Sequence, residues 1–412
     1  RDFHTSHNVT RGPAESAALA INRGCDLNCG NTFDYARGAV SRGLITTDRI
    51  DQAVRRLLKT RVALGLLDPP EARPYRELSP DAVPWAEHAE LAREAAERSF
   101  VLLQNRNQLL PLQRESLRSI YVTGPYAAEA DVLLGNYYGI GTRLHTFLEG
   151  ISTGAGHSIK VEYRPGCLPD RPNENEVQWA IGEAAESDVT IAILGNHPFF
   201  EGEEGDAIAS GSMGDRSSLE MPEHQRQFLK ELRSRCSRLV LVVTGGSVFA
   251  MEEIVELADA ILSAGGTVGA AGGVALGRVL FGEAEPGGPL ALRLPYSTEA
   301  LPAFEEYSMS NRTYRFSERH MYPFGFGLRY GSVSLHDAHL ECLPAEGETL
   351  PRLAGPGASN SDGEDREETA RLLLPPSWFD YRGGAARNSG ELPAFLRDPD
   401  TLRLVFAAEN QG

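Results

Sequence analysis

Positive charge, cysteine and long apolar runs are all scarce in this sequence. Its 412 residues hold 40 Lys and Arg against 57 Asp and Glu, which gives a net charge of −17. Because phosphates and anionic lipids are bound through Lys and Arg, this balance excludes nucleic acid and the membrane surface as partners. No run approaches the roughly 18 uncharged apolar residues of a membrane span. Five cysteines are too few for a disulfide scaffold, and the odd count leaves at least one unpaired within the chain.

Several short motifs of catalysis and binding are also missing. No Gly-x-Ser-x-Gly elbow is present, so an α/β-hydrolase triad has no support. No His-Glu-x-x-His occurs, and Cys25 and Cys29 have neither the CxxC spacing nor the His partner of a zinc site. The glycine-rich segments 244–247 and 264–269 match neither the dinucleotide fingerprint nor the P-loop. We therefore expect no cofactor, neither metal nor nucleotide.

The first part of the chain alternates between helical and strand-like patterns. Residues 14–23 are Ala-rich and predict a helix, and residues 24–30, with a glycine at each end, predict a short strand. The apolar spacing over 32–67 is helical again, and Thr47 and Asp48 are capping candidates at the start of its second half. Such a run is what the last part of an α/β barrel gives, and alone it is too short to be a barrel.

After a proline-rich linker over 68–85 and a helix from about residue 85 to 98, strands and helices alternate. The strand candidates are short, β-branched and apolar on both faces, as buried parallel strands are. They are residues 99–105, 119–125, 159–165, 189–196, 238–246, 260–266 and 290–295. The helices between them include residues 174–187, 223–236 and 268–282. The pattern predicts an α/β fold with an open doubly wound sheet that has helices on both faces.

The last part of the chain has a different composition. Residues 344–398 are rich in Pro, Gly, Ser, Glu and Asp with little periodicity, which predicts a loose insertion. Residues 401–408 follow with the pattern of one β-strand. We expect this strand to have no partner left in the chain.

An acidic loop follows the strand candidate at 189–196, on the side of the sheet where ligands of such folds bind. Four carboxylates fall within six residues there, at Glu201, Glu203, Glu204 and Asp206, after two aromatic residues. Carboxylates this close repel one another, so one is driven to keep its proton. A protonated Glu beside an aromatic surface is what the general acid for a glycosidic oxygen requires. The alternative is a solvated acidic surface loop.

A second loop, over residues 213–222, contains Asp215 and Arg216 next to a turn. The two residues are candidates for a structural ion pair that holds the loop. They are also candidates for contacts with a polar ligand. We favour the structural role.

At this point the chain resembles glycoside hydrolase family 3, in its β-xylosidase/β-glucosidase branch. The resemblance extends from about residue 1 to 332 and rests on distinctive strings in a shared order. These are AALAINRGCDLNCG, IDQAVRRLLKTRVALGLLD, AREAAERSFVLLQNRNQLLPL, TGPYAAEADVLLGNYYG, EGEEGD followed by GDRSSLEMPEHQRQFLKEL, YSMSNRTYR and MYPFGFGLRY.

The resemblance implies a domain order for the chain. Residues 1–67 are expected to be the C-terminal end of a (β/α)8 barrel, and residues 68–98 a linker and helix. Residues 99–330 are expected to form the α/β sandwich of the family, with an open, mostly parallel sheet. Residues 331–398 are expected to be an irregular insertion, and residues 399–412 the first strand of a truncated fibronectin-III-like domain.

The family hydrolyses β-linked sugars from non-reducing ends with retention. An Asp of the barrel attacks the anomeric carbon, and a Glu of the second domain protonates the leaving oxygen and then activates water. In relatives this Glu lies about eleven residues before the Asp of the Gly-Asp-Arg string. The resemblance therefore points to Glu204 as the acid/base, with Glu203 and Glu201 as fallbacks. It implies a β-linked oligosaccharide as substrate, as in xylan catabolism.

The nucleophile is expected to be absent from this chain. In relatives it sits in a Ser-Asp-x-Gly string just upstream of the segment like RDFHTSHN, so Asp2 does not inherit the role. We therefore expect the fragment alone to be inactive. The sugar contacts that the resemblance leaves to this chain are proposed at His197, Phe199, Phe200, Asp215 and Arg216. Family members are often periplasmic or secreted, and the oligomeric state stays open.

A rival hypothesis is a non-catalytic sugar-binding or interaction domain derived from this family. In that case Tyr137, Tyr138, Phe199 and Phe200 are expected to form an aromatic platform.

Overall fold

The computed structural model consists of two compact units, residues 1–85 and residues 86–412, and each is described by itself. Its backbone is described over residues 2–73, 76, 78–134, 143–175, 179–202, 209–212, 214–265, 269–317, 319–331, 333–342, 371–373 and 402–410. No helix in these ranges is both long enough and apolar enough to cross a bilayer.

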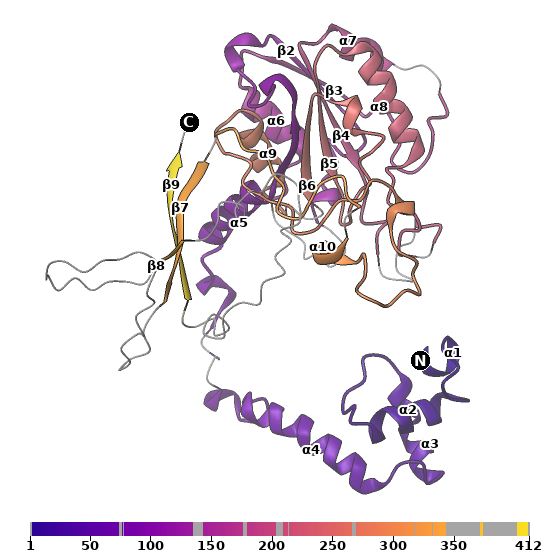
Figure 1. Cartoon of the computed structure of the whole chain (residues 1–412). Coiled ribbons are helices and arrows are strands. Elements are labelled where there is room, and N and C mark those ends of the chain that lie inside the picture. The colour runs from indigo at the N-terminus through magenta and orange to yellow at the C-terminus, as the bar shows by residue number, and fades with distance from the viewer. Residues whose placement is uncertain are drawn as a thin grey trace, which may run out of the picture. The chain divides into compact units, whose positions relative to one another are not determined.

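The described part of the first unit is helical (Figure 1). Its elements are α1 (Asp2–Thr5), α2 (Pro13–Asn22), the 3₁₀ turn η1 (Thr32–Tyr35), α3 (Ala36–Ser41) and α4 (Thr47–Ala63). The predicted helix at 14–23 is confirmed as α2. The predicted strand at 24–30 is wrong. The described part of this unit contains no other strand with which these residues could form hydrogen bonds. Gly24 and Gly30 adopt φ values of 107° and 123°, which fit turns rather than a strand.

The helical stretch predicted over 32–67 is broken into η1, α3 and α4. The capping residue of α4 is Thr46, whose hydroxyl accepts a hydrogen bond from the Arg49 amide at 3.2 Å, and not Thr47 or Asp48. The prediction was one residue off because three hydroxyl or carboxylate residues stand in a row. In this unit α4 buries only Ala53, so most of its apolar side chains face outward.

Two short 3₁₀ turns, η2 (Pro70–Ala72) and η3 (Pro80–Ala82), mark the linker before α5 (Trp85–Ser99). The predicted helix at 85–98 is confirmed as α5. Each turn starts at a proline, whose fixed φ suits the first position of a helical turn.

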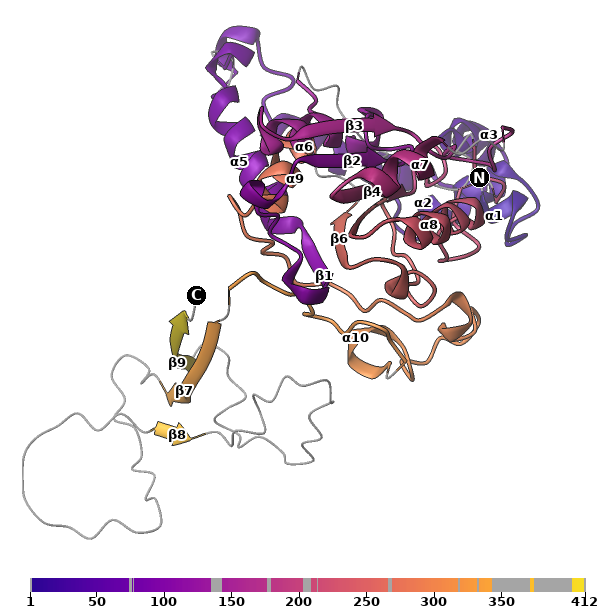
Figure 2. The same ribbon diagram turned by 90° about the horizontal axis from the view of Figure 1, so that it is seen from above.

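A six-stranded sheet forms the centre of the second unit (Figures 1 and 2). Its strands are β1 (Val101–Asn105), β2 (Ser119–Thr123), β3 (Lys160–Arg164), β4 (Val189–Gly195), β5 (Leu239–Thr244) and β6 (Ala260–Gly265). The order across the sheet is β1-β6-β5-β4-β2-β3. All neighbours are parallel except β1, which pairs with β6 in the antiparallel direction. The mostly parallel sheet is therefore confirmed, with one antiparallel edge strand.

Six of the seven strand candidates form strands of this sheet, and the seventh, at 290–295, does not. In that segment Leu290 donates to the Phe326 carbonyl, and Leu294 forms a single bridge with Tyr322. The segment carries the alternating apolar pattern of a strand because Leu290 and Leu294 are buried. Its backbone partners are in a loop, and so no ladder develops.

Helices cover both faces of the sheet, as predicted. Figure 1 shows α6 (Phe147–Ala155) and α9 (Gly272–Leu280) on one side, and α7 (Trp179–Glu186) and α8 (Glu223–Arg235) on the other. The alternation along β4 assigns the faces, because Ile191 and Ile193 belong to the first core and Leu194 to the second.

Helix α6 was missing from the predicted set. Its signal is local, since Thr146 and Glu149 form a reciprocal capping box. The helix packs very closely on α9, and a Cβ on Gly150 would lie 1.6 Å from the Gly273 carbonyl oxygen. Glycine is therefore required at this crossing.

A separate three-stranded antiparallel sheet follows, with the order β8-β7-β9. Its strands are β7 (Val333–Cys342), β8 (Arg371–Leu373) and β9 (Leu402–Asn410). The last strand was predicted to have no partner in the chain, and this is wrong, because β9 pairs with β7 over most of its length. Two strands also lie within the predicted irregular insertion at 331–398. The remainder of the segment 344–398 lies outside the described residues.

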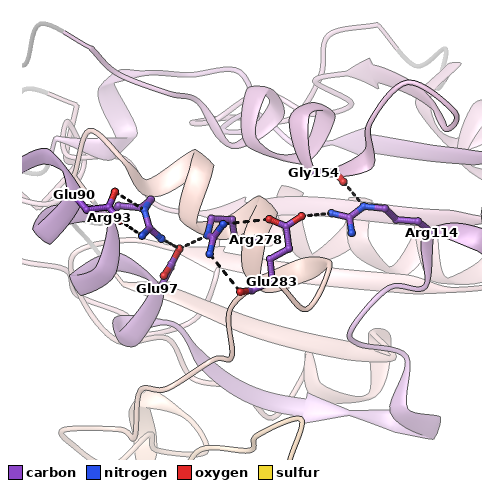
Figure 3. Close-up of polar contacts among 7 residues, drawn as sticks. All are labelled: Glu90, Arg93, Glu97, Arg114, Gly154, Arg278 and Glu283. Carbon is purple, nitrogen blue, oxygen red and sulfur yellow. Dashed lines mark hydrogen bonds and ion pairs between the residues drawn. The ribbon is translucent and has the colours of Figure 1, made fainter. Parts of the chain in front are cut away.

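A chain of ion pairs joins α5 to the rest of the second unit (Figure 3). On α5, Arg93 bridges Glu90 and Glu97. Glu97 also accepts a hydrogen bond from Nε of Arg278 on α9 at 2.6 Å. Because Glu97 is only 8% exposed, it depends on these two guanidinium groups.

The chain of contacts continues beyond α9 (Figure 3). Arg278 reaches Glu283 at 3.3 Å, and Glu283 pairs with Arg114 at 2.5 Å. Arg114 also donates to the Gly154 carbonyl at 2.7 Å, at the end of α6. The network thus ties α5 to α9 and α6 at one face of the sheet.

This network predicts that Glu97→Ala lowers the free energy of unfolding by about 2 kcal/mol, because two guanidinium groups lose their shared buried acceptor. Urea denaturation of the chain measures it. The matched control is Glu94→Ala, which breaks the exposed pair with Arg98 and should cost at most about 0.5 kcal/mol. Equal effects of the two substitutions would contradict the structural role of Glu97.

Candidate active site

The sheet has a point where the direction of its connections reverses. Strand β2 pairs with β3 on one side and with β4 on the other. The connections that leave β2 and β4 therefore diverge, and ligands of such sheets bind outside the carboxyl ends of the strands at this point. The acidic loop begins there, directly after β4.

An aromatic cluster surrounds His197 after β4. Its ring lies 6.2 Å from Tyr126, 4.6 Å from Phe199 and 6.3 Å from Phe200, measured between ring centroids. Nδ1 accepts a hydrogen bond from the Phe199 amide at 3.1 Å, which leaves the proton of the neutral ring on Nε2. Burial lowers the pKa of His197, so the ring is neutral at pH 7 and offers a hydrogen-bond donor.

Glu201 is buried at the start of the acidic loop, with 8% of its surface exposed. Oε1 accepts a hydrogen bond from Asn196 at 3.0 Å and another from the Ser247 hydroxyl. Oε2 accepts a hydrogen bond from the Gly246 amide at 2.5 Å. Both carboxylate oxygens are thus engaged by protein donors.

Arg216 approaches the same carboxylate, with Nη1 3.6 Å from Oε1 of Glu201. The guanidinium donates to the Ser247 hydroxyl at 2.8 Å and to the Val248 carbonyl at 2.9 Å. It also donates to the Glu220 carbonyl at 3.1 Å and lies 4.5 Å from the centroid of the Phe249 ring. The side chain is 12% exposed. Three of its five N–H donors are thus directed to loops of the protein.

Glu220 lies near the end of the second loop, residues 213–222, and anchors it by hydrogen bonds. Its carboxylate accepts hydrogen bonds from the Thr298 amide at 2.9 Å, from the Thr298 hydroxyl at 2.6 Å and from Ser218. Burial alone would raise the pKa of Glu220, but these hydrogen bonds outweigh it and lower the pKa to about 2. The segment is therefore held to the loop around Thr298.

An open hollow of about 340 Å³ lies beside these residues. Its lining includes Phe200, Arg216, Ser210, Asn196 and Asp170. An aromatic ring next to hydroxyl, amide and carboxylate groups suits a ligand with an apolar face and hydroxyl groups at its edge. In the described part of the chain, no group of three or more His, Cys, Asp and Glu side chains is arranged to hold a metal ion.

A sequence model described as the glycosyl hydrolase family 3 C-terminal domain matches residues 100–330. The chain belongs to glycoside hydrolase family 3. The matched region contains the whole six-stranded sheet and the loops after β4 and β5. The predicted family is thereby confirmed.

Relatives and solved structures agree with this family. The chain is 32% identical over 346 residues to a β-xylosidase/α-L-arabinofuranosidase of Medicago sativa subsp. varia, covering 80% of this chain and 43% of the relative. It is 31% identical over 342 residues to β-D-xylosidase 1 of Arabidopsis thaliana, covering 80% and 42%. A family 3 exo-β-xylosidase bound to a xylobiose aziridine probe superposes with a TM-score of 0.70 at 26% identity, covering 81% and 43%.

A family 3 chain of this length is short beside its relatives. The match covers 43% of the first curated relative and 42% of the second, so the chain spans less than half the length of each.

The structure brings most of the predicted site residues to the end of β4 and the loop beside it. His197, Phe199 and Phe200 form the aromatic cluster, and Glu201 and Arg216 pair with each other. The ion pair that holds the second loop is thus not between the neighbours Asp215 and Arg216. Asp215 is exposed, whereas the Arg216 side chain turns inward over Phe249.

Four of the predicted residues fall outside the described part of the chain. These are Glu203 and Glu204, and the aromatic platform residues Tyr137 and Tyr138. The acid/base role of Glu204 therefore stays a prediction.

The sequence did not predict that the glycine-rich segment 244–247 binds an anion, the carboxylate of Glu201. The segment matches no phosphate-binding motif, and its Gly246 amide binds the carboxylate of Glu201 instead. The glycines after β5 were the available signal, because they let a backbone amide approach an anion. Glu220 carried no comparable signal, since its partner Thr298 lies far away in the sequence.

The hydrogen bonds of Glu220 predict a pH-dependent contribution to stability. Because its pKa is lower in the folded than in the unfolded state, its contribution is complete above about pH 5 and is lost as the pH falls toward 2. The loss of melting temperature in Glu220→Gln should therefore be largest above pH 5 and shrink toward zero near pH 2. Thermal melts from pH 7 to 2 measure it.

The exposed Glu231→Gln on α8 is the control for the change of charge. A difference in melting temperature between Glu220→Gln and this control that stays constant down to pH 2 would contradict the account.

Proposed function

We propose that this chain is the C-terminal part of a retaining, exo-acting β-xylosidase or β-glucosidase. The intact enzyme removes terminal β-linked sugars from plant-type oligosaccharides. The observation that supports this most is the position of the acidic loop. It begins directly after β4 at the reversal point of a family 3 sheet, where the described residues that flank it include a neutral His197 and a side of the polar hollow at Phe200.

The proposed reaction needs two carboxyl groups about 5–5.5 Å apart. An Asp from a barrel outside this chain attacks the anomeric carbon, and the bond to the leaving oxygen breaks. Glu204 gives its proton to that oxygen, with Glu203 as the first fallback. The Glu204 carboxylate then takes a proton from water. The water oxygen attacks the anomeric carbon and releases the Asp, so the β configuration is retained.

The described residues supply sugar contacts in this proposal. Phe199 has a half-exposed ring that can stack on the apolar face of a pyranose, and Phe200 lines the hollow. The Nε2 proton of His197 can donate to a sugar hydroxyl, and Asp215 is exposed and can accept from one. Arg216 directs three of its five N–H donors to the loops, and it also lines the hollow.

We assign residues 1–67, which lie within the first unit, to the end of the barrel. Its helix α4 supports this, because Val54, Leu58 and Val62 recur on one face and are 44%, 41% and 58% exposed. An apolar stripe of this kind is normally covered by a packing partner. In an intact family 3 enzyme the rest of the barrel provides it.

We also propose that a fibronectin-III-like domain begins in this chain. The antiparallel sheet β8-β7-β9 supports it, because such domains are sandwiches of antiparallel sheets. The domain then starts at β7, earlier than the predicted boundary at residue 399.

Two aromatic side chains of the second unit are strongly exposed. Phe304 and Tyr307 are each 83% exposed in the segment before α10 (Thr313–Phe316). Single exposed rings are common on protein surfaces, so these two do not decide between the hypotheses. The non-catalytic hypothesis is not favoured, since the relatives are named as hydrolases.

The proposal predicts that purified residues 1–412 do not hydrolyse aryl β-xylosides or β-glucosides, whereas the intact protein does. In the intact protein, Glu204→Ala should lower kcat/KM about 10²- to 10⁴-fold for substrates with poor leaving groups. Activated aryl glycosides should suffer less, because their leaving groups need no proton, and added azide should restore part of the rate.

Steady-state kinetics across a series of leaving groups checks this prediction. Glu203→Ala is the matched control within the loop, and Glu204→Gln, which also removes the acid, should behave like Glu204→Ala. An equal loss on all substrates without azide rescue would make Glu204 structural and Glu203 the next candidate. Turnover by residues 1–412 alone that depends on Glu204 would overturn the division of the two carboxylates between chain and barrel.

A further inference from the structure

The six-stranded sheet loses one strand where β2 ends. In the order of strands β2 lies between β4 and β3, and its last residue, Thr123, pairs with Ala192 of β4. β4 continues beyond this pair to Gly195, whereas the chain after β2 turns away at Gly124, which has a φ of 105°. In the described sheet, no strand therefore lies between the end of β4 and the loop after β3, residues 165–173.

The side chain of Gln225 on α8 bridges this gap. Its Oε1 accepts a hydrogen bond from the Gly195 amide at 2.9 Å, and its Nε2 donates to the Pro169 carbonyl at 3.3 Å. These partners fix the orientation of the side-chain amide, because a backbone N–H only donates and a carbonyl only accepts. Gln225 is fully buried, so water does not compete for either bond. We call these two hydrogen bonds the Gln225 clamp.

The loop after β3 is held to α8 as one piece. Nε2 of His224, the residue before Gln225, donates to the Leu168 carbonyl at 3.0 Å. Within the loop, Asn173 accepts a hydrogen bond from the Leu168 amide at 3.0 Å and donates to the Gly166 carbonyl at 2.8 Å. Two consecutive residues of α8 therefore set the position of the loop, and Gln225 ties it to the end of β4.

Both segments that Gln225 joins line the hollow. Asn196 comes directly after β4, and Pro169 and Asp170 belong to the loop after β3. Asn196 is also held by β5, since its amide donates to the Thr244 carbonyl at 2.8 Å. The loop after β3 leaves the last strand of the sheet, which has a neighbour on one side only. It is therefore the wall of the hollow that depends on Gln225.

We propose that Gln225 is a positioning residue, which holds the loop after β3 at a set distance from β4 and so fixes the width of the sugar-binding hollow. It does so without contact to the sugar, because its side chain is fully buried and both polar atoms are engaged. Hydrogen bonds to sugar hydroxyls form only over a narrow range of distances, so a wider hollow binds the sugar less tightly. The sugar-binding part of this inference rests on the proposed function, and the Gln225 clamp does not.

Hydrogen exchange on the chain itself tests the clamp. Met has a length similar to that of Gln and no N–H donor, so in Gln225→Met peptides from the loop after β3 should exchange at least about tenfold faster than in the unaltered chain. Gln225→Asn is the milder second variant, because its shorter amide cannot span both partners. The matched control is Gln227→Met, whose exposed side chain donates to Glu223 within α8. Unchanged exchange of the loop in whichever Gln225 variant folds would overturn the clamp.

Steady-state kinetics of the intact enzyme tests the effect on sugar binding. With xylobiose or cellobiose as substrate, Gln225→Met should raise KM about tenfold and leave kcat within about twofold, because a wider hollow weakens ground-state and transition-state binding alike. The control for lost stability is Glu97→Ala, which weakens the fold at α5 and should leave KM unchanged.

The opposite results overturn the inference. A lower kcat at unchanged KM would mean that Gln225 supports the chemical step and not the hollow. An equal rise of KM in Glu97→Ala would reduce Gln225 to a general contribution to stability. Faster exchange of the loop without any change in KM would show that the hollow does not bind the sugar. If the unaltered intact protein hydrolyses no β-glycoside, the proposed function fails, and the exchange experiment still decides the clamp.

Discussion

The full burial of β4 is the constraint on which the site depends. All seven of its residues are buried between two layers of helices, and it pairs with β2 on one side and β5 on the other. Its end is therefore fixed to within the tolerance of a packed core. The residues that follow inherit that position, and they include the aromatic cluster around His197 and the start of the acidic loop.

The loops beyond this rigid end are held by charge and by backbone donors. Glu201 accepts a hydrogen bond from the Gly246 amide, and Arg216 donates one to the Val248 carbonyl. Glu220 accepts hydrogen bonds from the backbone amide and the hydroxyl of Thr298. Each of these contacts joins segments that lie far apart in sequence. A loop that carries a general acid needs such support, because a displacement of about 1 Å can cost two orders of magnitude in rate.

The sequence was sufficient for the six strands of the large sheet and for most of its helices. Short apolar runs bounded by glycine and polar residues are a local signal, and so they could be found without knowing their partners. Pairing is not a local property, which explains the errors. Segment 290–295 has the pattern of a strand, but its partners lie in a loop, and β9 was left unpaired although β7 is available.

The same distinction holds at the site. The family resemblance indicated the acidic loop, and composition alone left its function open. The partner of Arg216 could not be predicted, because the exposed Asp215 beside it is the obvious choice and the buried Glu201 is the actual one. Only the folded chain shows that Glu201 and Arg216, which are fifteen positions apart in the sequence, form an ion pair.

We propose that this chain supplies the acid/base of a retaining glycosidase, and that the nucleophile lies in a barrel outside residues 1–412. Covalent trapping tests it most directly. The intact protein is incubated with a 2-deoxy-2-fluoro aryl β-glycoside, and the glycosylated peptide is identified by mass spectrometry. The account predicts one sugar on an Asp of the barrel and none within residues 1–412. A sugar on any carboxylate of this chain would contradict it.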